Sequence, residues 1–218
     1  MMTEVLILYV GVIGSITALY HLRGIGFIGD YLSTIVAILL MYPAVWHVRF
    51  RRLPVVFFEK TGAQVLHSLK YFALTALAIF PVFLLLAHVY QTQIFHLRFN
   101  PKGFHWSWET AAVQVILVAL PEEFFFRGYL QTMLATKFSR RFRLFGLKLF
   151  EMPTAVPIAC VVFAFSHSVI TLRWWQFAIV FPSLAFGWLR EKTGGLIAPV
   201  LFHALSNLIL FQVGSFYR

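Results

Sequence analysis

Two glutamates and an arginine lie inside an apolar stretch. They are Glu122, Glu123 and Arg127, in the segment AAVQVILVALPEEFFFR. A charged side chain near the centre of a bilayer raises the free energy of membrane insertion by about 2.5–3.5 kcal/mol. Glu123 and Arg127 are four residues apart with the acid first, the favourable order for an ion pair on one helix face. Glu122 points about 100° away from Glu123, so it is left free to act as a general base. A buried salt bridge that only fixes helix packing explains Glu123 and Arg127 equally well.

Two further apolar segments carry side chains that could act on a peptide bond. His167 follows Phe163 by four residues, which places both on one face of a helix. His203 and Asn207 have the same spacing, and both can donate hydrogen bonds to a developing oxyanion. Taken alone, a histidine such as His167 is more often a packing residue. His203 and Asn207 alone are equally an interhelical polar clamp, of the kind that membrane bundles use.

The three segments together favour a catalytic site. Polar groups in lipid face the bundle interior or a water-filled cavity. The three helices therefore have reason to converge on one wet pocket that holds a carboxylate base, two imidazoles and an amide. We predict an all-α fold, a polytopic transmembrane helix bundle of about seven spans, with a polar cavity between its fourth, fifth and seventh helices.

The composition agrees with a membrane protein. Of the 218 residues, 60% are hydrophobic and only 12% are charged, whereas a soluble domain carries about 25% charged residues. We expect three spans within residues 1–107 and a catalytic membrane core at 108–213, in one continuous membrane domain. Stretches of the length that a bilayer requires are predicted at residues 4–22, 31–48, 65–90, 108–135, 153–171, 174–190 and 195–213.

The formal charge of +10 does not indicate nucleic-acid binding, because the basic residues gather in short loops between apolar segments. That pattern is typical of topology signals and lipid headgroup contacts. The loops 49–64, 136–152 and 191–194 hold most of the loop Lys and Arg, which favours a cytoplasmic N-terminus and an external C-terminus. The single cysteine, Cys160, excludes an internal disulfide and a CxxC metal site.

The three motifs, in this order, resemble those of the CPBP family of intramembrane proteases, which comprises the CAAX prenyl endopeptidases and the bacteriocin-processing (Abi) proteins. EExxxR is matched by Glu122, Glu123 and Arg127, FxxxH by Phe163 and His167, and HxxxN by His203 and Asn207. The resemblance covers roughly residues 108–212, and the residues before it match only as apolar helices. The chain has no HExxH motif and a single aspartate, so other intramembrane protease chemistries fit poorly.

The resemblance implies an endopeptidase in which Glu122 activates a water that His167 helps to hold. His203 and Asn207 would then form the oxyanion hole. The supporting residues implied by the resemblance are Glu123, Arg127 and Phe163. The family has also been described as metalloproteases, and Glu122, His167 and His203 would in that case be zinc ligands. We expect no cofactor, because HExxH is absent and Asn207 suits an oxyanion better than a soft metal.

The resemblance implies a membrane-anchored protein or peptide as the partner, and three family roles remain open. The substrate is a prenylated CAAX tail, a bacteriocin or pheromone precursor, or a C-terminal sorting signal. The compact chain favours a prokaryotic cell (inner) membrane. The competing hypothesis is a non-catalytic membrane protein with a role in bacteriocin immunity, membrane-protein chaperoning or transport, although no inverted repeat supports transport.

Overall fold

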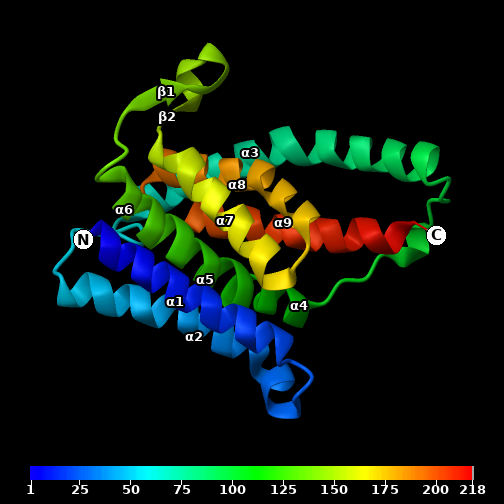
Figure 1. The fold of residues 1–218 in the computed structure, drawn as a ribbon. Coiled ribbons are helices and arrows are strands. Elements are labelled where there is room, and N and C mark those ends of the chain that lie inside the picture. The colour runs from blue at the N-terminus through cyan, green and yellow to red at the C-terminus, as the bar shows by residue number, and fades with distance from the viewer. Residues whose placement is uncertain (218) are drawn as a thin grey trace.

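The computed structural model describes residues 1–217, which form a helix bundle with one small hairpin (Figure 1). Its N-terminal part contains α1 (Met2–His21), α2 (Gly26–Phe50) and α3 (Gly62–Val89), and α3 continues as the π-helical segment η1 (Tyr90–Ile94). Its C-terminal part contains α7 (Ala155–Thr171), the 3-10 helix η7 (Trp174–Ile179), α8 (Val180–Thr193) and α9 (Ile197–Phe216). Every apolar segment predicted from the sequence is helical, and the all-α fold class is confirmed.

A long helix that carries the EExxxR motif runs between these two parts, and we call residues 108–135 the motif helix. Its hydrogen-bond register alternates, with Leu120 N bonded to Val115 O in the π pattern. The proline at position 121 cannot donate a backbone hydrogen bond, so the ordinary α register is interrupted just before the two glutamates. Its segments are α4 (Trp108–Val113), η3 (Gln114–Ala119), α5 (Leu120–Glu123), η4 (Phe124–Gln131) and α6 (Thr132–Ala135).

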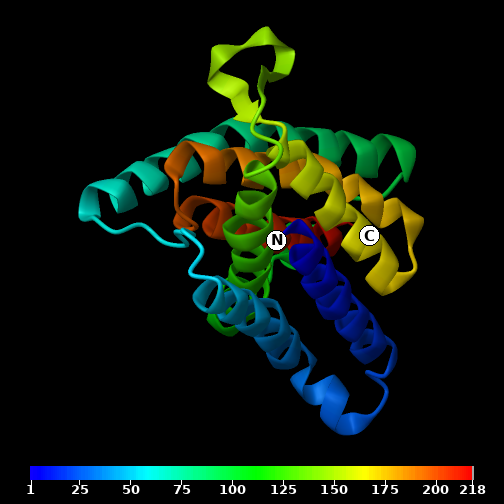
Figure 2. The same cartoon turned by 60° about the vertical axis from the view of Figure 1, so that its left-hand side comes forward.

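The motif helix is the centre of the bundle. The antiparallel pair α1 and α2 packs on one side of it, and α3, α8 and α9 lie on the other (Figures 1 and 2). Helix α7 fills the remaining side, in contact with α1, α8 and the motif helix. Residues 124–131 are buried throughout. Because other helices surround this segment, a small change in its helical hydrogen-bond register moves the side chains that it presents to α7 and α9.

The outer helices have the properties of membrane spans. Within residues 1–217, α1, α2, α3 with η1, and α9 are long and apolar enough to cross a bilayer, and α7 is a shorter apolar helix. Leu66, Leu77 and Leu85 of α3 are 70%, 72% and 64% exposed. An apolar helix that turns its leucines outward is stable in lipid and not in water. The chain is therefore an integral membrane protein, while the number of seven spans stays a prediction.

The loop between α2 and α3 holds the start of α9 against the motif helix. The Glu59 carboxylate accepts hydrogen bonds from Ile197 N at 3.3 and 3.4 Å, which satisfies a donor that a helix N-terminus leaves free. Phe57 stacks on Phe124 with ring centroids 3.9 Å apart. Gly128 permits this approach, since a Cβ there would lie 2.6 Å from Phe57 Cδ1. The N-terminal half thus positions two of the site-bearing helices.

A hairpin projects from the bundle between α6 and α7 (Figures 1 and 2). Strands β1 (Arg141–Arg143) and β2 (Glu151–Pro153) are antiparallel, and the turn between them contains the 3-10 helices η5 (Leu144–Gly146) and η6 (Lys148–Phe150). The sequence analysis predicted only a loop at 136–152. Strands of three residues show too little alternation of apolar and polar side chains to be recognised from sequence.

Candidate active site

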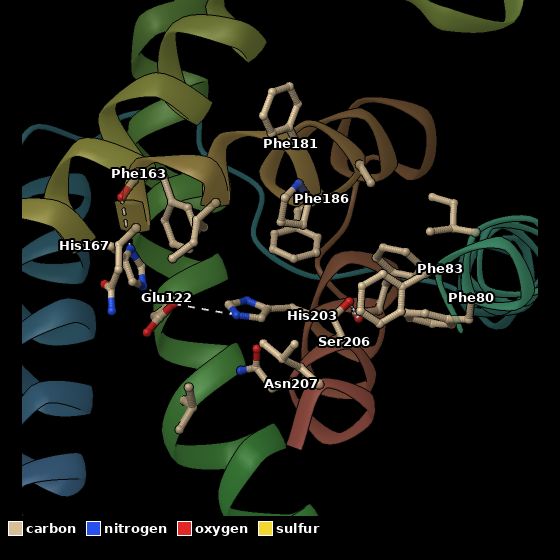
Figure 3. Close-up of a pocket in the computed structure, with 18 residues that line it drawn as sticks. Phe80, Phe83, Glu122, Phe163, His167, Phe181, Phe186, His203, Ser206 and Asn207 are labelled. Atoms are coloured by element: carbon tan, nitrogen blue, oxygen red, sulfur yellow. Dashed lines mark hydrogen bonds and ion pairs between the residues drawn. The ribbon is translucent and has the colours of Figure 1, made fainter. Parts of the chain in front are cut away.

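A cavity of about 580 Å³ lies between α3, α7, η7, α8, α9 and the motif helix (Figure 3). The predicted placement between the fourth, fifth and seventh helices was incomplete, because α3 and α8 also contribute walls. Most of the lining is apolar, and it includes six phenylalanines: Phe80, Phe83, Phe163, Phe181, Phe186 and Phe202. Four polar lining residues are those that the sequence singled out: Glu122, His167, His203 and Asn207.

Glu122 is the carboxylate that faces the cavity, and its side chain is 19% exposed. Its Oε2 lies 3.7 Å from His167 Nε2 and 3.8 Å from His203 Nε2. Both separations exceed a direct hydrogen bond, and this oxygen has no hydrogen-bond partner within the described chain. A buried carboxylate oxygen without a partner is unusual and calls for a missing donor such as water or a substrate group.

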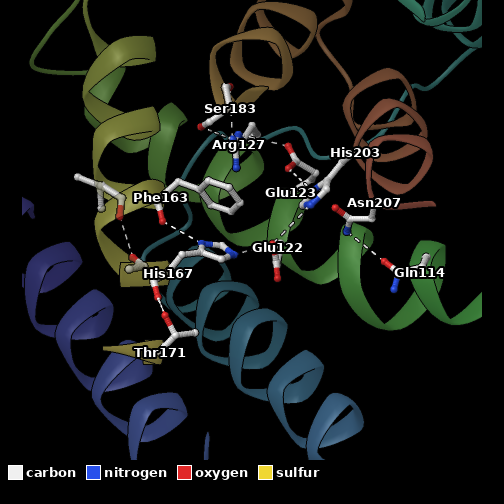
Figure 4. A network of polar contacts seen from close by, with 12 residues as sticks. Gln114, Glu122, Glu123, Arg127, Phe163, His167, Thr171, Ser183, His203 and Asn207 are labelled. Carbon is white, nitrogen blue, oxygen red and sulfur yellow. Dashed lines mark hydrogen bonds and ion pairs between the residues drawn. The ribbon is translucent and has the colours of Figure 1, made fainter. Parts of the chain in front are cut away.

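Glu123 points away from the cavity and is completely buried (Figure 4). Its Oε1 accepts a hydrogen bond from His203 Nδ1 at 2.8 Å, and its Oε2 lies 3.3 Å from Arg127 Nε. The ion pair with Arg127 has the spacing that the sequence predicted. The bond to His203 was not predicted, because it joins two residues far apart in the sequence.

Arg127 is the buried cation behind the site. Its Nη2 donates to Ser183 Oγ at 2.7 Å, and its guanidinium carbon lies 4.2 Å from the centroid of the Phe163 ring. The arginine therefore has a carboxylate, a hydroxyl and an aromatic face as neighbours, which together offset the cost of burying the charge. Phe163 packs between this cation and the two histidine rings.

The two histidines present the same nitrogen to the cavity. His167 Nδ1 lies 3.0 Å from Phe163 O, and a carbonyl oxygen only accepts, so this nitrogen carries the hydrogen. His203 Nδ1 likewise donates to Glu123. In both rings Nε2 is left to face Glu122. The His203 ring also stacks on Phe186, with ring centroids 4.6 Å apart and planes 14° apart, which fixes its orientation.

Asn207 lies one turn beyond His203 on α9, and its Nδ2 donates to Gln114 Oε1 at 3.0 Å (Figure 4). Gln114, Ser183 and Phe186 are contacts of the site that sequence reasoning missed. The signal for Gln114 in the sequence is a lone amide inside an apolar run. Ser183 and Phe186 gave no such signal, because serine and phenylalanine are ordinary residues in a membrane helix.

The donor types of Glu122, His167 and His203 suit zinc, and each histidine has the outer acceptor that metal-bound imidazoles use. Ligands at about 2.0–2.1 Å from a tetrahedral zinc lie roughly 3.3 Å from one another, whereas the separations from Glu122 are 3.7 and 3.8 Å. Within residues 1–217, no group of three or more His, Cys, Asp or Glu side chains is placed to hold a metal ion. The separations from Glu122 are thus wider than those between the ligands of a bound zinc ion.

Comparison with known proteins agrees with the motifs. Residues 104–209 match the family described as type II CAAX prenyl endopeptidase Rce1-like. Neither a curated protein nor a solved structure matches the chain. The matched stretch contains the motif helix, α7 and α8, together with the part of α9 that carries His203 and Asn207. Residues 104–209 therefore form a domain of the Rce1-like family of type II CAAX prenyl endopeptidases, as the resemblance of the three motifs predicted.

Proposed function

We propose that the protein is an intramembrane endopeptidase in which Glu122 activates a water for attack on a peptide bond. The observation that carries the proposal is Glu122 Oε2, which has no hydrogen-bond partner within residues 1–217 and faces two imidazole Nε2 atoms inside a mostly apolar cavity. A carboxylate in such a cavity is costly unless it has a polar partner. A water between these groups supplies that partner and is also the nucleophile.

His167 and Glu122 together orient this water. The His167 Nδ1 hydrogen is engaged by Phe163 O, so the Nε2 of the neutral ring accepts a hydrogen bond. The water then donates one hydrogen to Glu122 Oε2 and the other to His167 Nε2. A lone pair of the water oxygen remains free to attack a carbonyl carbon. Glu122 is the general base, and His167 fixes the direction of attack.

His203 and Asn207 stabilise the oxyanion. As the water attacks, its proton moves to Glu122, a C–O bond forms, and the carbonyl oxygen becomes negatively charged. Because His203 Nδ1 donates to Glu123, Nε2 donates to this oxygen only when the ring carries a second hydrogen, and the Glu123 carboxylate then lies beside the positive ring. Asn207 Nδ2 provides the second donor. Collapse of the intermediate breaks the C–N bond, and Glu122 returns its proton to the leaving amine.

The aromatic walls indicate the kind of substrate. Six phenylalanines around the catalytic groups suit a polypeptide that reaches the cavity from the membrane, or one that carries a lipid chain. We infer a membrane-anchored protein or peptide: a prenylated CAAX tail, the substrate that the family description names, a bacteriocin or pheromone precursor, or a C-terminal sorting signal. We further propose a prokaryotic inner membrane with a cytoplasmic N-terminus, supported by the basic loops 49–64 and 136–152.

The proposal is tested with Glu122→Gln in proteoliposomes, using a fluorogenic farnesylated CAAX peptide and a fluorogenic transmembrane peptide with a basic tail. We expect kcat to fall by at least about 100-fold on the cleaved substrate, the effect of losing a general base. Glu109→Gln is the matched control, because Glu109 is an exposed acid on the same helix. A folded Glu122→Gln protein with full activity would exclude the mechanism and favour a non-catalytic role.

A further inference from the structure

The amide of Asn207 has one side-chain hydrogen-bond partner within residues 1–217, and that partner is Gln114. Both residues are partly buried, and they lie on helices that approach each other at η3 and α9. Gln114 belongs to none of the three motifs. We propose that Gln114 is a positioning residue for the oxyanion hole, and this proposal rests on the proposed function above.

The orientation of a carboxamide decides whether it helps or hinders an oxyanion. Its nitrogen carries two hydrogens, whereas its oxygen carries lone pairs that repel negative charge. Gln114 Oε1 takes one Nδ2 hydrogen of Asn207 at 3.0 Å. This bond fixes the plane of the Asn207 amide and leaves the second Nδ2 hydrogen for the cavity that Asn207 lines. Without Gln114, the amide is free to rotate and to present its oxygen instead.

The same arrangement recurs at the other oxyanion donor. Glu123 accepts a hydrogen bond from His203, just as Gln114 accepts one from Asn207. Both acceptors belong to the motif helix, on either side of the base Glu122. The helix that carries the base therefore also orients the two donors of α9. In this way the motif helix positions all three groups that act on one carbonyl, namely Glu122, His203 and Asn207.

The interrupted register of the motif helix fits this role. Gln114 is the first residue of the π-helical segment η3, which ends directly before the α-helical turn of the two glutamates. A π segment rotates the residues before it relative to those after it, and such segments are frequent at functional sites. Gln114 contacts Asn207 of α9, and Glu122 lines the cavity that α9 also lines.

A packing role for the pair predicts something different from a positioning role. If the two amides only clamp the helices together, the loss of either one weakens folding, and the coupling between them appears in the free energy of unfolding and not in kcat. If Gln114 acts through Asn207, its removal has no effect on turnover once Asn207 is gone. A double-mutant cycle separates the two, because residues that act as a unit are not additive.

The experiment compares Gln114→Met, Asn207→Ala and the double variant in proteoliposomes with the peptide that the unaltered protein cleaves. We expect Asn207→Ala to lower kcat about 100-fold and Gln114→Met about tenfold, with KM changed less than about twofold. The double variant should match Asn207→Ala alone. Gln212→Met is the matched control, because Gln212 lies on α9, accepts a hydrogen bond from His105 N at 3.2 Å and is not among the residues that line the cavity.

Losses that multiply in the double variant, or a Gln114→Met enzyme with unchanged kcat, would overturn the positioning role. Thermal unfolding identifies a variant that has lost its fold, and Gln114→Ala then replaces Gln114→Met in the cycle. The underlying mechanism is judged separately. If Glu122→Gln keeps its activity, the proposed function fails. If Glu122→Gln loses its activity but the effects of Gln114→Met and Asn207→Ala on kcat are additive, only the positioning role of Gln114 is rejected.

Discussion

Glu123 Oε1 lies 2.8 Å from His203 Nδ1, and this bond joins the EExxxR helix to the HxxxN helix beneath the cavity. The same carboxylate faces Arg127 through its other oxygen, at 3.3 Å. Glu123 therefore has two partners. One is the permanent cation Arg127, and the other is the His203 ring, which needs a second hydrogen before its Nε2 can donate. Only the first of these partners could be predicted from the sequence.

We predict that Glu123→Gln lowers kcat about 100-fold, because the amide still accepts from His203 Nδ1 but no longer places a negative charge beside the ring. The same change leaves Arg127 buried without a counter-ion, since both side chains are completely buried. Loss of one partner of a buried pair costs about 3–5 kcal/mol of folding free energy. Kinetics with the cleaved peptide and thermal unfolding measure the two effects.

The double variant Glu123→Gln with Arg127→Met separates these effects. Replacing the buried cation by an apolar side chain of similar length removes the unpaired charge, so most of the stability should return. The kcat should stay low, because the charge beside His203 is still missing. A double variant that regains kcat along with stability would show that Glu123 only supports the packing.

The helices and the motif residues could be predicted from the sequence because their signals are local. Apolar runs bounded by polar loops mark the helices, and a spacing of four residues places Glu123 with Arg127 and His203 with Asn207 on shared helix faces. The ion pair of Glu123 with Arg127 follows directly from that spacing. Nothing beyond one helical turn is needed for these predictions.

The contacts that hold the site together could not be predicted, because they join distant segments. Glu123 meets His203, Asn207 meets Gln114, and Arg127 meets Ser183 only after the helices have packed. The alternation of α and π register in the motif helix is also absent from the hydrophobic pattern. It depends on which backbone groups find partners in the folded bundle.

We predict that the peptidase does not require zinc. The separations of 3.7 and 3.8 Å between Glu122 and the two imidazoles suit a bridging water better than ligands around one ion. Activity in proteoliposomes should stay within about twofold after dialysis against 1,10-phenanthroline. A purified protein with one zinc per chain, inactivated by the chelator and restored by zinc, would establish the metal mechanism instead.

Gly128→Ala should destabilise the fold, because the added Cβ would lie 2.6 Å from Phe57 Cδ1 and 3.3 Å from Leu196 Cδ1. Phe57 cannot withdraw without losing its stacking on Phe124. We expect a loss of about 1–3 kcal/mol, the usual cost of overpacking, measured as a lower midpoint of thermal unfolding. Gly14→Ala is the control, since a Cβ at Gly14 meets nothing within 4 Å. Equal midpoints for the two variants would contradict the close approach.

Glu151 ties the hairpin together and makes its stability depend on pH. Arg143 donates a hydrogen bond to Glu151 at 2.9 Å, and this bond, with a second from Arg141, holds the pKa of the Glu151 carboxyl below its ordinary value. A lowered folded pKa stabilises the hairpin at every pH above the unfolded value of about 4.3. That contribution disappears as the pH falls through the lowered folded pKa.

Hydrogen exchange of the β1 and β2 amides, corrected for the intrinsic rate, should thus stay constant from about pH 7 to 5 and rise below about pH 4. Glu151→Gln should raise this exchange already at neutral pH and remove its acid dependence. Its kcat should stay unchanged, because no residue of the hairpin lines the cavity. A variant with the same acid-dependent exchange as the unaltered protein would show that the hairpin is held by other contacts, such as the hydrogen bond from Trp188 Nε1 to Leu149 O.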